Sequence, residues 1–388
     1  MLNRTLLSLG TETAFTVLAR AGELANQGKS IINLGIGQPD FSTPPHIVDA
    51  GITALRDGAH GYTPSMGLPI LREAVQEDLS ARYGYCPPIS QIQITPGGKP
   101  VIFMAAMIYG GVDSEIILPN PSFPIYQSAV AYSQATPVFY SLKEQNGFAF
   151  NADEILSKIT SNTNMIMINS PHNPTGGITP PSEIKKLVEG LTLHPNITLF
   201  SDEIYDRLVF DNKPHSLLSY PEIRDRLILL NGWSKTYAMT GWRIGYGIWP
   251  KQAIEFADKI GVNYHSCVNA PTQFAALAAT TGDQSCVEEM RLAFNRRAAI
   301  ITHKLNEIKG ISCQKPKGAF YAFPNISAFG ISSDKIQTEL LEEFGVAGIS
   351  GTAFGSFGEG YLRLSSANSD ALISEACDRL KQLANGYL

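Results

Sequence analysis

Short apolar runs alternate with stretches of helical periodicity through the middle of the chain. Four such runs, each bounded by proline, glycine or polar residues, lie at 116–118, 165–168, 197–200 and 227–230. Runs this short and this apolar are typical of strands that are buried on both faces of a sheet. Because helical stretches separate the runs, the pattern predicts βαβ units, and therefore an α/β fold with a mostly parallel sheet flanked by helices.

A longer helix is predicted over 287–308, where apolar residues recur every three or four positions until Gly310 interrupts the pattern. Beyond it the pattern changes to shorter strands and helices, and the last of these helices is opened by Asp370. We therefore predict a large domain that ends inside the long helix, near Arg291, and a smaller α+β domain after it.

Composition places the chain among globular proteins with a sizeable core. Of its 388 residues, 44% are hydrophobic and 17% are charged, and at ~100–200 residues per domain this length accommodates two or three domains. The net charge is −5, from 30 basic and 35 acidic residues, which argues against a nucleic-acid-binding protein. No apolar run approaches the ~18 residues that span a bilayer, and the first residues lack the pattern of a signal peptide, so no membrane association is expected.

The five cysteines are widely spaced and never form a C-x-x-C pair, which favours a reducing compartment and predicts a cytoplasmic protein. The seven histidines include no H-E-x-x-H motif, so no protein-held catalytic metal is expected. The chain also lacks the G-x-S-x-G, G-x-x-x-x-G-K-[ST] and G-x-G-x-x-G motifs. These absences together argue against a serine hydrolase, a P-loop enzyme and a standard dinucleotide-binding fold.

Three of the predicted strands lead directly into polar clusters. Asn173 follows one of them, Asp202 and Tyr205 follow the next, and Lys235 follows the third. In an open parallel sheet, ligands bind beyond the carboxyl ends of the strands. Each residue taken alone is as compatible with a solvated loop, but three such clusters in succession predict that these side chains converge in one cleft.

Lys235 is the sharpest of these candidates. A lysine that follows an apolar strand is partly desolvated, which lowers the pKa of its ammonium group and leaves an amine that attacks carbonyls. Arg243 follows eight residues later, between Gly241 and Gly245. Because glycines let a ligand approach the backbone closely, an arginine at this place suits an anion such as phosphate.

Two further anion sites are suggested by the sequence. Gly97, Gly98 and Lys99 lie between a predicted strand and an apolar helix, where free backbone N–H groups bind phosphate, although an ordinary βα turn has the same pattern. Arg363 stands in an otherwise apolar, strand-like run. A buried arginine needs an anionic partner, either a substrate carboxylate or an acidic residue in a structural ion pair.

Four segments carry a family resemblance: Asn173-Pro174-Thr175-Gly176, Asp202-Glu203-Ile204-Tyr205, Ser234-Lys235 and Gly241-Trp242-Arg243-Ile244-Gly245. In order and spacing they resemble the motifs of class I/II aminotransferases, pyridoxal-phosphate (PLP) enzymes of fold type I. The resemblance extends from the segment at residue 34 to Arg363. It implies a large PLP-binding domain over 46–290 and a discontinuous small domain formed by 1–45 and 291–388.

The resemblance implies a role toward the cofactor for each candidate. Lys235 would hold PLP as a Schiff base, and Asp202 would pair with the pyridine nitrogen, so that the ring acts as an electron sink. Tyr205 and Asn173 would hydrogen-bond the phenolic oxygen, and Phe123 would stack on the ring. The phosphate group would be bound by Arg243, Ser234 and the backbone amides of Gly98 and Lys99.

The resemblance also implies how the substrate binds and reacts. Arg363, with Asn173, would bind the α-carboxylate, and Gly35 would line the substrate side. Tyr62 would reach the cofactor phosphate of a neighbouring subunit, which implies a homodimer with shared active sites. Lys235, displaced by an incoming amino acid, would move the Cα proton as a general base, and a second 2-oxo acid would complete a ping-pong cycle.

Two positions depart from the family pattern. Gly232 stands where many relatives have a serine that binds the phosphate, so one phosphate contact is expected to be missing and Ser234 to compensate for it. His172 stands where relatives often have asparagine or glycine, and we expect it to be a loop histidine without a functional role.

The substrate is predicted from Lys99. One aspartate-using subgroup resembles this chain in carrying Gly-Gly-Lys at 97–99, and its lysine contacts the distal carboxylate; no arginine occurs between Trp249 and Met290 to do so instead. We therefore predict transfer of the amino group of L-aspartate to 2-oxoglutarate. The alternatives are an aromatic or broad-specificity aminotransferase, a PLP-dependent C–S or β-lyase on the same scaffold and, remotely, a non-catalytic PLP-binding regulator.

Overall fold

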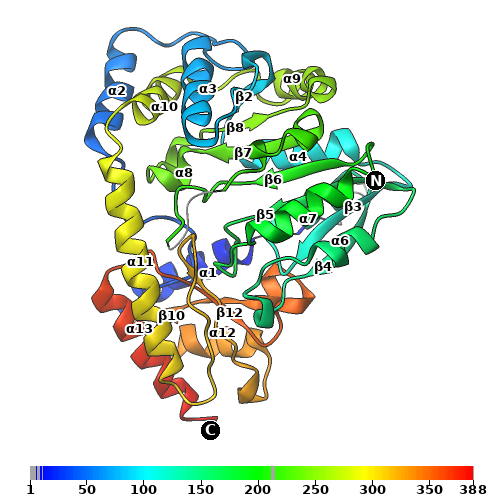
Figure 1. Ribbon diagram of the computed structural model, residues 1–388. Helices are drawn as coiled ribbons and strands as arrows, with labels where there is room; N and C mark the ends of the chain where they lie inside the picture. The colour runs from blue at the N-terminus through cyan, green and yellow to red at the C-terminus, as the bar shows by residue number, and fades with distance from the viewer. Residues whose placement is uncertain (1–5, 7–8, 11, 211–214, 388) are drawn as a thin grey trace.

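The computed structural model describes residue 6 and residues 9–10, 12–210 and 215–387. Its central sheet consists of β2 (Ile92–Thr95), β3 (Glu115–Asn120), β4 (Thr136–Ser141), β5 (Thr163–Asn169), β6 (Thr198–Asp202), β7 (Leu227–Gly232) and β8 (Gly245–Ile248). The strand order is β2-β8-β7-β6-β5-β3-β4 (Figure 1). All neighbouring pairs are parallel except those that β8 makes with β2 and β7. The predicted mostly parallel α/β sheet is therefore confirmed.

Helices cover both faces of this sheet. They are α2 (Pro45–Arg56), α3 (Pro69–Tyr83), α4 (Lys99–Tyr109), α5 (Pro124–Tyr132), α6 (Ala152–Ser157), α7 (Pro181–Leu191), α9 (Lys251–His265) and α10 (Ala270–Thr281). Ile116 and Leu118 of β3 pack in one cluster with α4, α5 and α9, whereas Ile117 packs in another cluster with α2, α3, α7 and α10. Because successive side chains of a strand point to opposite faces, this double coverage explains why the strands are continuously apolar.

A second, smaller group of elements lies below the sheet in Figure 1. It contains β1 (Ile32–Asn33), β9 (Tyr321–Ala322), β10 (Val346–Ala347), β11 (Ile349–Ser350), β12 (Leu362–Ser365), α12 (Ser333–Glu342) and α13 (Asp370–Ala384). β1 pairs in parallel with β10, and β11, β12 and β9 form an antiparallel sheet. Ile32 and Leu34 share one hydrophobic cluster with residues of α12 and α13. The N-terminal segment therefore packs with the C-terminal part of the chain.

The helix α11 (Ser285–Asn306) runs along one side of the molecule from the upper group of elements to the lower one (Figure 1). Its apolar stripe enters three successive clusters, through Val287, then Phe294, then Leu305. It ends before Ile308, so the predicted end was two residues too late; Gly310 adopts the left-handed conformation beyond it, at φ 79°. The domain limit near Arg291 stays a prediction. None of the helices in the described residues is long and apolar enough to cross a membrane.

We predict that Phe294→Ala destabilises the protein by about 3 kcal/mol or more, because the side chain is fully buried and its loss leaves a cavity. Its ring stacks on Phe320 at 5.1 Å and meets Phe41 edge-on at 5.6 Å. Chemical denaturation of the purified variant measures this loss. Leu292→Ala on the same helix is the control, since Leu292 is 52% exposed. Equal midpoints for the two variants would contradict the packing described here.

Candidate active site

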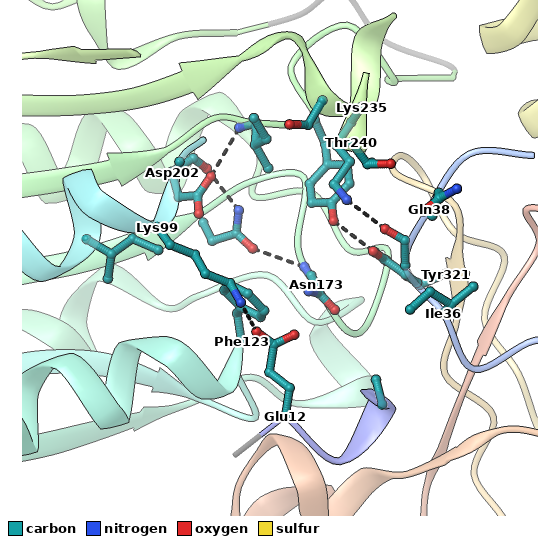
Figure 2. A pocket seen from close by; sticks show the side chains of 18 of the residues that line it. Glu12, Ile36, Gln38, Lys99, Phe123, Asn173, Asp202, Lys235, Thr240 and Tyr321 are labelled. Carbon is teal, nitrogen blue, oxygen red and sulfur yellow. Dashed lines mark hydrogen bonds and ion pairs between the residues drawn. The ribbon is translucent and has the colours of Figure 1, made fainter. Parts of the chain in front are cut away.

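A cavity of about 420 Å³ opens at the carboxyl ends of β5, β6 and β7 (Figure 2). Its lining brings together ten of the residues singled out in the sequence, namely Gly98, Lys99, Phe123, Asn173, Asp202, Tyr205, Ser234, Lys235, Arg243 and Arg363. Ile36, Gly37 and Gln38 of the N-terminal segment close its other side. The four side chains predicted to converge beyond the strand ends, those of Asn173, Asp202, Tyr205 and Lys235, therefore do line one cavity.

Lys235 lies in α8 (Trp233–Thr236), the single helical turn that follows β7 directly. Its Nζ donates a hydrogen bond to the carbonyl oxygen of Gly37 at 2.6 Å. Burial, and to a smaller extent the positive charges of Arg363 and Arg243, lower the pKa of Lys235 to about 8. With this pKa, about a tenth of the amine is unprotonated at pH 7, and this form can act as a nucleophile or a general base.

Asp202 ends β6 and is buried at the base of the cavity. Its carboxylate accepts a hydrogen bond from the hydroxyl of Tyr126 at 2.7 Å and one from the backbone N–H of Ile204 at 3.1 Å. Burial raises the pKa of Asp202 to about 6, although these two hydrogen bonds and the charge of Lys235 act in the opposite direction. A carboxylate this desolvated is stabilised by a cationic group placed against it.

Arg363 is 4% exposed, in β12. It donates to the side-chain oxygen of Asn173 at 3.1 Å and to the carbonyl oxygen of Gly35 at 2.6 Å, and its guanidinium carbon lies 4.7 Å from the ring centre of Tyr321. No carboxylate of the described residues forms an ion pair with it, and its Nε has no hydrogen-bond partner there. A buried guanidinium with these properties favours an anionic ligand over a structural ion pair.

Gly97 and Arg243 form the anion-binding side of the cavity. Gly97 has φ +87°, and a Cβ atom there would lie only 2.1 Å from Nη2 of Arg243. The next residue, Gly98, precedes the first turn of α4, and both Gly98 and Lys99 line the cavity. The first backbone N–H groups of a helix have no partner within the helix and bind anions. Glycine is thus required for the arginine and the helix end to approach one common position. This arrangement fits a phosphate group.

The groups that line this cavity together fit pyridoxal phosphate. They comprise a desolvated amine at Lys235, a buried carboxyl at Asp202, a phosphate cradle around Arg243, and the ring of Phe123 on the same cavity wall. In the described part of the chain, no group of three or more histidine, cysteine or acidic side chains is arranged to hold a metal ion.

The departure at Gly232 has a steric reason. A Cβ atom at this position would lie 2.7 Å from the Cα atom of Gly245 and 3.2 Å from the carbonyl oxygen of Ile244. Contacts this close exclude any side chain unless β7 and β8 separate. The serine found in relatives therefore does not fit this pair of strands, and the neighbouring Ser234 lines the cavity.

Two of the predicted residues lie elsewhere. Gly35 is not part of the cavity lining; its carbonyl oxygen accepts the hydrogen bond from Arg363, so it lies behind the guanidinium group. Tyr62 is 93% exposed and does not line the cavity of its own chain. Its predicted contact with a neighbouring subunit stays a prediction.

Three residues of the site were missed by the sequence analysis. Tyr126 holds Asp202, and Tyr321 forms a hydrogen bond of 2.8 Å with the hydroxyl of Tyr205. Glu12 forms an ion pair with Lys99 inside the cavity. Tyr126 could have been found, because it lies three residues after Phe123 at the start of a helix and so shares its face. The other two lie far from their partners in the sequence and carry no local signal.

Comparison with known proteins gives a consistent result. The family model for class I and II aminotransferases matches residues 29–380. An aspartate aminotransferase from Pyrococcus horikoshii is 39% identical over 94% of this chain and 93% of its own. An aromatic-amino-acid aminotransferase from Thermococcus litoralis is 36% identical over 93% of each chain. The crystal structure of the aspartate aminotransferase from Rhizobium meliloti has a TM-score of 0.94 at 30% identity and covers 99% of both chains.

His172, which precedes Asn173, lies outside the helices and strands, as expected of a loop histidine, but its side chain is buried. Its Nδ1 lies 2.9 Å from the hydroxyl of Thr175, and its Nε2 has no partner among the described residues. Burial lowers the pKa of His172 to about 3. As pH falls below about 6.5, the unfolded chain binds a proton at this ring that the folded chain does not bind until about pH 3, so stability is lost across that interval.

We therefore predict that His172→Asn loses less stability than the parent protein between pH 7 and pH 5, by about 2 kcal/mol. Chemical denaturation at the two pH values measures the difference. His303→Asn is the control, because the side chain of His303 is 76% exposed. A parallel loss in the parent protein and in His172→Asn would show that this ring does not govern the acid response.

Proposed function

The chain belongs to the class I and II aminotransferase family, and from that premise we propose that it transfers the amino group of L-aspartate to 2-oxoglutarate. As a member of the family it is a PLP-dependent transaminase, whose substrates are amino acids and 2-oxo acids. One observation carries the choice of an acidic substrate. The wall of the cavity holds two cations, Arg363 and Lys99, in addition to the reactive amine of Lys235 and to Arg243.

Bound PLP supplies a carbonyl carbon for exchange of the amino group and a ring that accepts electrons from the substrate Cα. Lys235 provides the amine that holds the cofactor, and its Nζ accepts the Cα proton and returns it, which the lowered pKa of this group permits. Asp202, held by Tyr126, would pair its carboxylate with the ring nitrogen and keep that nitrogen protonated. Phe123, which lines the cavity, would cover one face of the ring.

Arg363 positions the substrate. Its two terminal nitrogens are directed by Asn173 and Gly35, so the guanidinium group has one orientation from which it binds the α-carboxylate. The ammonium group of Lys99 lies 5.9 Å from the ring centre of Phe123. Since Phe123 is proposed to cover the cofactor, Lys99 lies within reach of a substrate side chain and suits a distal carboxylate.

A homodimer and a cytoplasmic location are part of this proposal. Tyr62 is a large side chain that is 93% exposed, and tyrosine is enriched at the interfaces between protein chains. We propose that it contributes to the phosphate site of the partner subunit. The five cysteines are all free, which agrees with a reducing compartment.

An aromatic substrate is the second candidate, for a specific reason. Lys99 is already paired with Glu12, and its ammonium group lies 5.8 Å from the ring centre of Phe15 and 5.9 Å from that of Phe123. A paired lysine between two rings presents little net charge to a substrate. A lyase on the same scaffold would use the same residues, and differs in releasing ammonia and a 2-oxo acid without needing an amino acceptor.

The first test is an absorbance titration of the holoenzyme with single amino acids. We expect L-aspartate to convert the cofactor band faster than L-phenylalanine, and 2-oxoglutarate to restore it. Faster conversion by phenylalanine would assign the aromatic reaction instead. Release of ammonia and a 2-oxo acid without an added acceptor would assign a lyase, and a band that no amino acid converts would contradict a transaminase.

Lys99→Ala separates the two substrate classes. We predict that kcat/KM for L-aspartate falls about tenfold, since one charge-assisted hydrogen bond of roughly 1.5 kcal/mol is lost, while kcat/KM for L-phenylalanine changes less than twofold. Steady-state kinetics with both donors measure this. Lys185→Ala on α7 is the control, because the side chain of Lys185 is 68% exposed and lies outside the cavity lining. An equal loss for both donors would remove the role of Lys99 in specificity.

A further inference from the structure

Glu12 places a carboxylate inside the cavity. It directly precedes α1 (Thr13–Asn26), and its side chain is 15% exposed. Its Oε1 forms an ion pair with Nζ of Lys99, drawn as a dashed line in Figure 2. The group that would bind a distal carboxylate of the substrate is thus already bound to a carboxylate of the protein.

The side chains that line the cavity carry more positive than negative charge. Four cationic side chains line the cavity, and only two acidic side chains do so among the described residues, Glu12 and Asp202. Asp202 is engaged with Tyr126 at the base of the cavity. Glu12 acts over a wider region, because its charge partly opposes the lowering of the pKa values of Lys235 and Arg363 that their burial causes. Its carboxylate therefore lies within the electrostatic field in which a substrate must bind.

We propose that Glu12 is a specificity-determining residue that competes with the distal carboxylate of an acidic substrate for Lys99. A dicarboxylic substrate must displace Glu12 before it binds Lys99, whereas a substrate with a neutral side chain binds without breaking the ion pair. This inference rests on the proposed function, since it assumes that Lys99 receives the distal carboxylate. It predicts that the ion pair between Glu12 and Lys99 reduces the affinity for acidic amino acids relative to that for neutral ones.

The structure allows this displacement without undocking of α1. The side chain of Glu12 makes no capping hydrogen bond to the helix that it precedes. The helix is fixed further along, by burial of Val17, Ala21 and Leu24 and by the ion pair of Arg20 with Glu342 of α12. Rotation of the Glu12 side chain therefore releases Lys99 at the cost of one partly exposed ion pair.

The decisive variant is Glu12→Gln, studied as the holoenzyme by calorimetry with succinate, a dicarboxylate that has no amino group to transfer. Partly exposed ion pairs contribute at most about a fivefold change in an equilibrium constant. We expect Glu12→Gln to bind succinate about three- to fivefold more tightly than the parent enzyme, and 3-phenylpropionate, which lacks a distal charge, with unchanged affinity.

Glu23→Gln is the matched control. It removes the same charge from the same helix, but the side chain of Glu23 is 61% exposed and pairs with Arg20 outside the cavity. We expect it to leave the succinate affinity unchanged. Equal tightening in Glu12→Gln and Glu23→Gln would reduce the effect to net charge and overturn the proposal, as would unchanged or weaker succinate binding in Glu12→Gln.

Lys99→Ala distinguishes failure of this inference from failure of the proposed function. If competition is the mechanism, the gain from Glu12→Gln disappears in the double variant that also carries Lys99→Ala. Weaker succinate binding in Lys99→Ala without any gain in Glu12→Gln would overturn only the role of Glu12. Succinate binding that does not depend on Lys99 would overturn the acidic substrate itself, and with it this inference.

Discussion

The guanidinium group of Arg363 joins three parts of the chain that are far apart in sequence. It stands in β12, donates to Asn173 in the loop that follows β5, and donates to the carbonyl of Gly35 in the N-terminal segment. Burying this charge without a carboxylate partner is unfavourable by itself. The cost is reduced by these two hydrogen bonds and by the faces of the Tyr321 and Phe354 rings. An anionic substrate would supply the missing carboxylate partner. The hydrogen bonds that hold Arg363 in place therefore also leave its guanidinium group ready to bind an anion.

Burial is the main cause of the lowered pKa of Lys235, and the same surplus of positive charge adds to it. Lys235 is desolvated, and Arg363 and Arg243 lie near enough to disfavour its protonated form. The cations that suit two anionic ligands, a phosphate group and a carboxylate, therefore also keep part of the amine uncharged. Asp202 is the counterpart on the other side of the cavity, where burial raises the pKa of a carboxyl that a cationic ring nitrogen would stabilise.

Glu12 modifies this charge pattern at a single position. By pairing with Lys99, it neutralises one of the two cations proposed to bind a dicarboxylic substrate, while it leaves Arg363 available. Relatives that are named for aspartate and for aromatic amino acids match this chain with similar identity. If one ion pair sets the charge at the place where the substrate side chain binds, the same catalytic residues can serve a preference for aspartate or one for aromatic amino acids.

Local sequence pattern was enough to predict the central sheet and the edge of that sheet at which the reactive side chains lie. Runs such as 165–168 are too apolar for an exposed strand, so they had to lie in the middle layer, and the polar residues that follow them had to meet at one edge. Asn173, Asp202 and Lys235 were therefore predictable from local pattern, as were Arg243 and Arg363 as anion-binding candidates. The family motifs added the roles of these residues toward the cofactor and the substrate.

The groups that the site residues contact could be identified only from the way the chain packs in three dimensions. Lys99 and Glu12 are 87 residues apart, and Arg363 and Gly35 are 328 apart. The close approach of β7 and β8 that excludes a side chain at Gly232 is likewise set by packing. Hydrophobic periodicity records which face of an element is buried, but not which distant segment covers it, because that depends on how all the elements pack together.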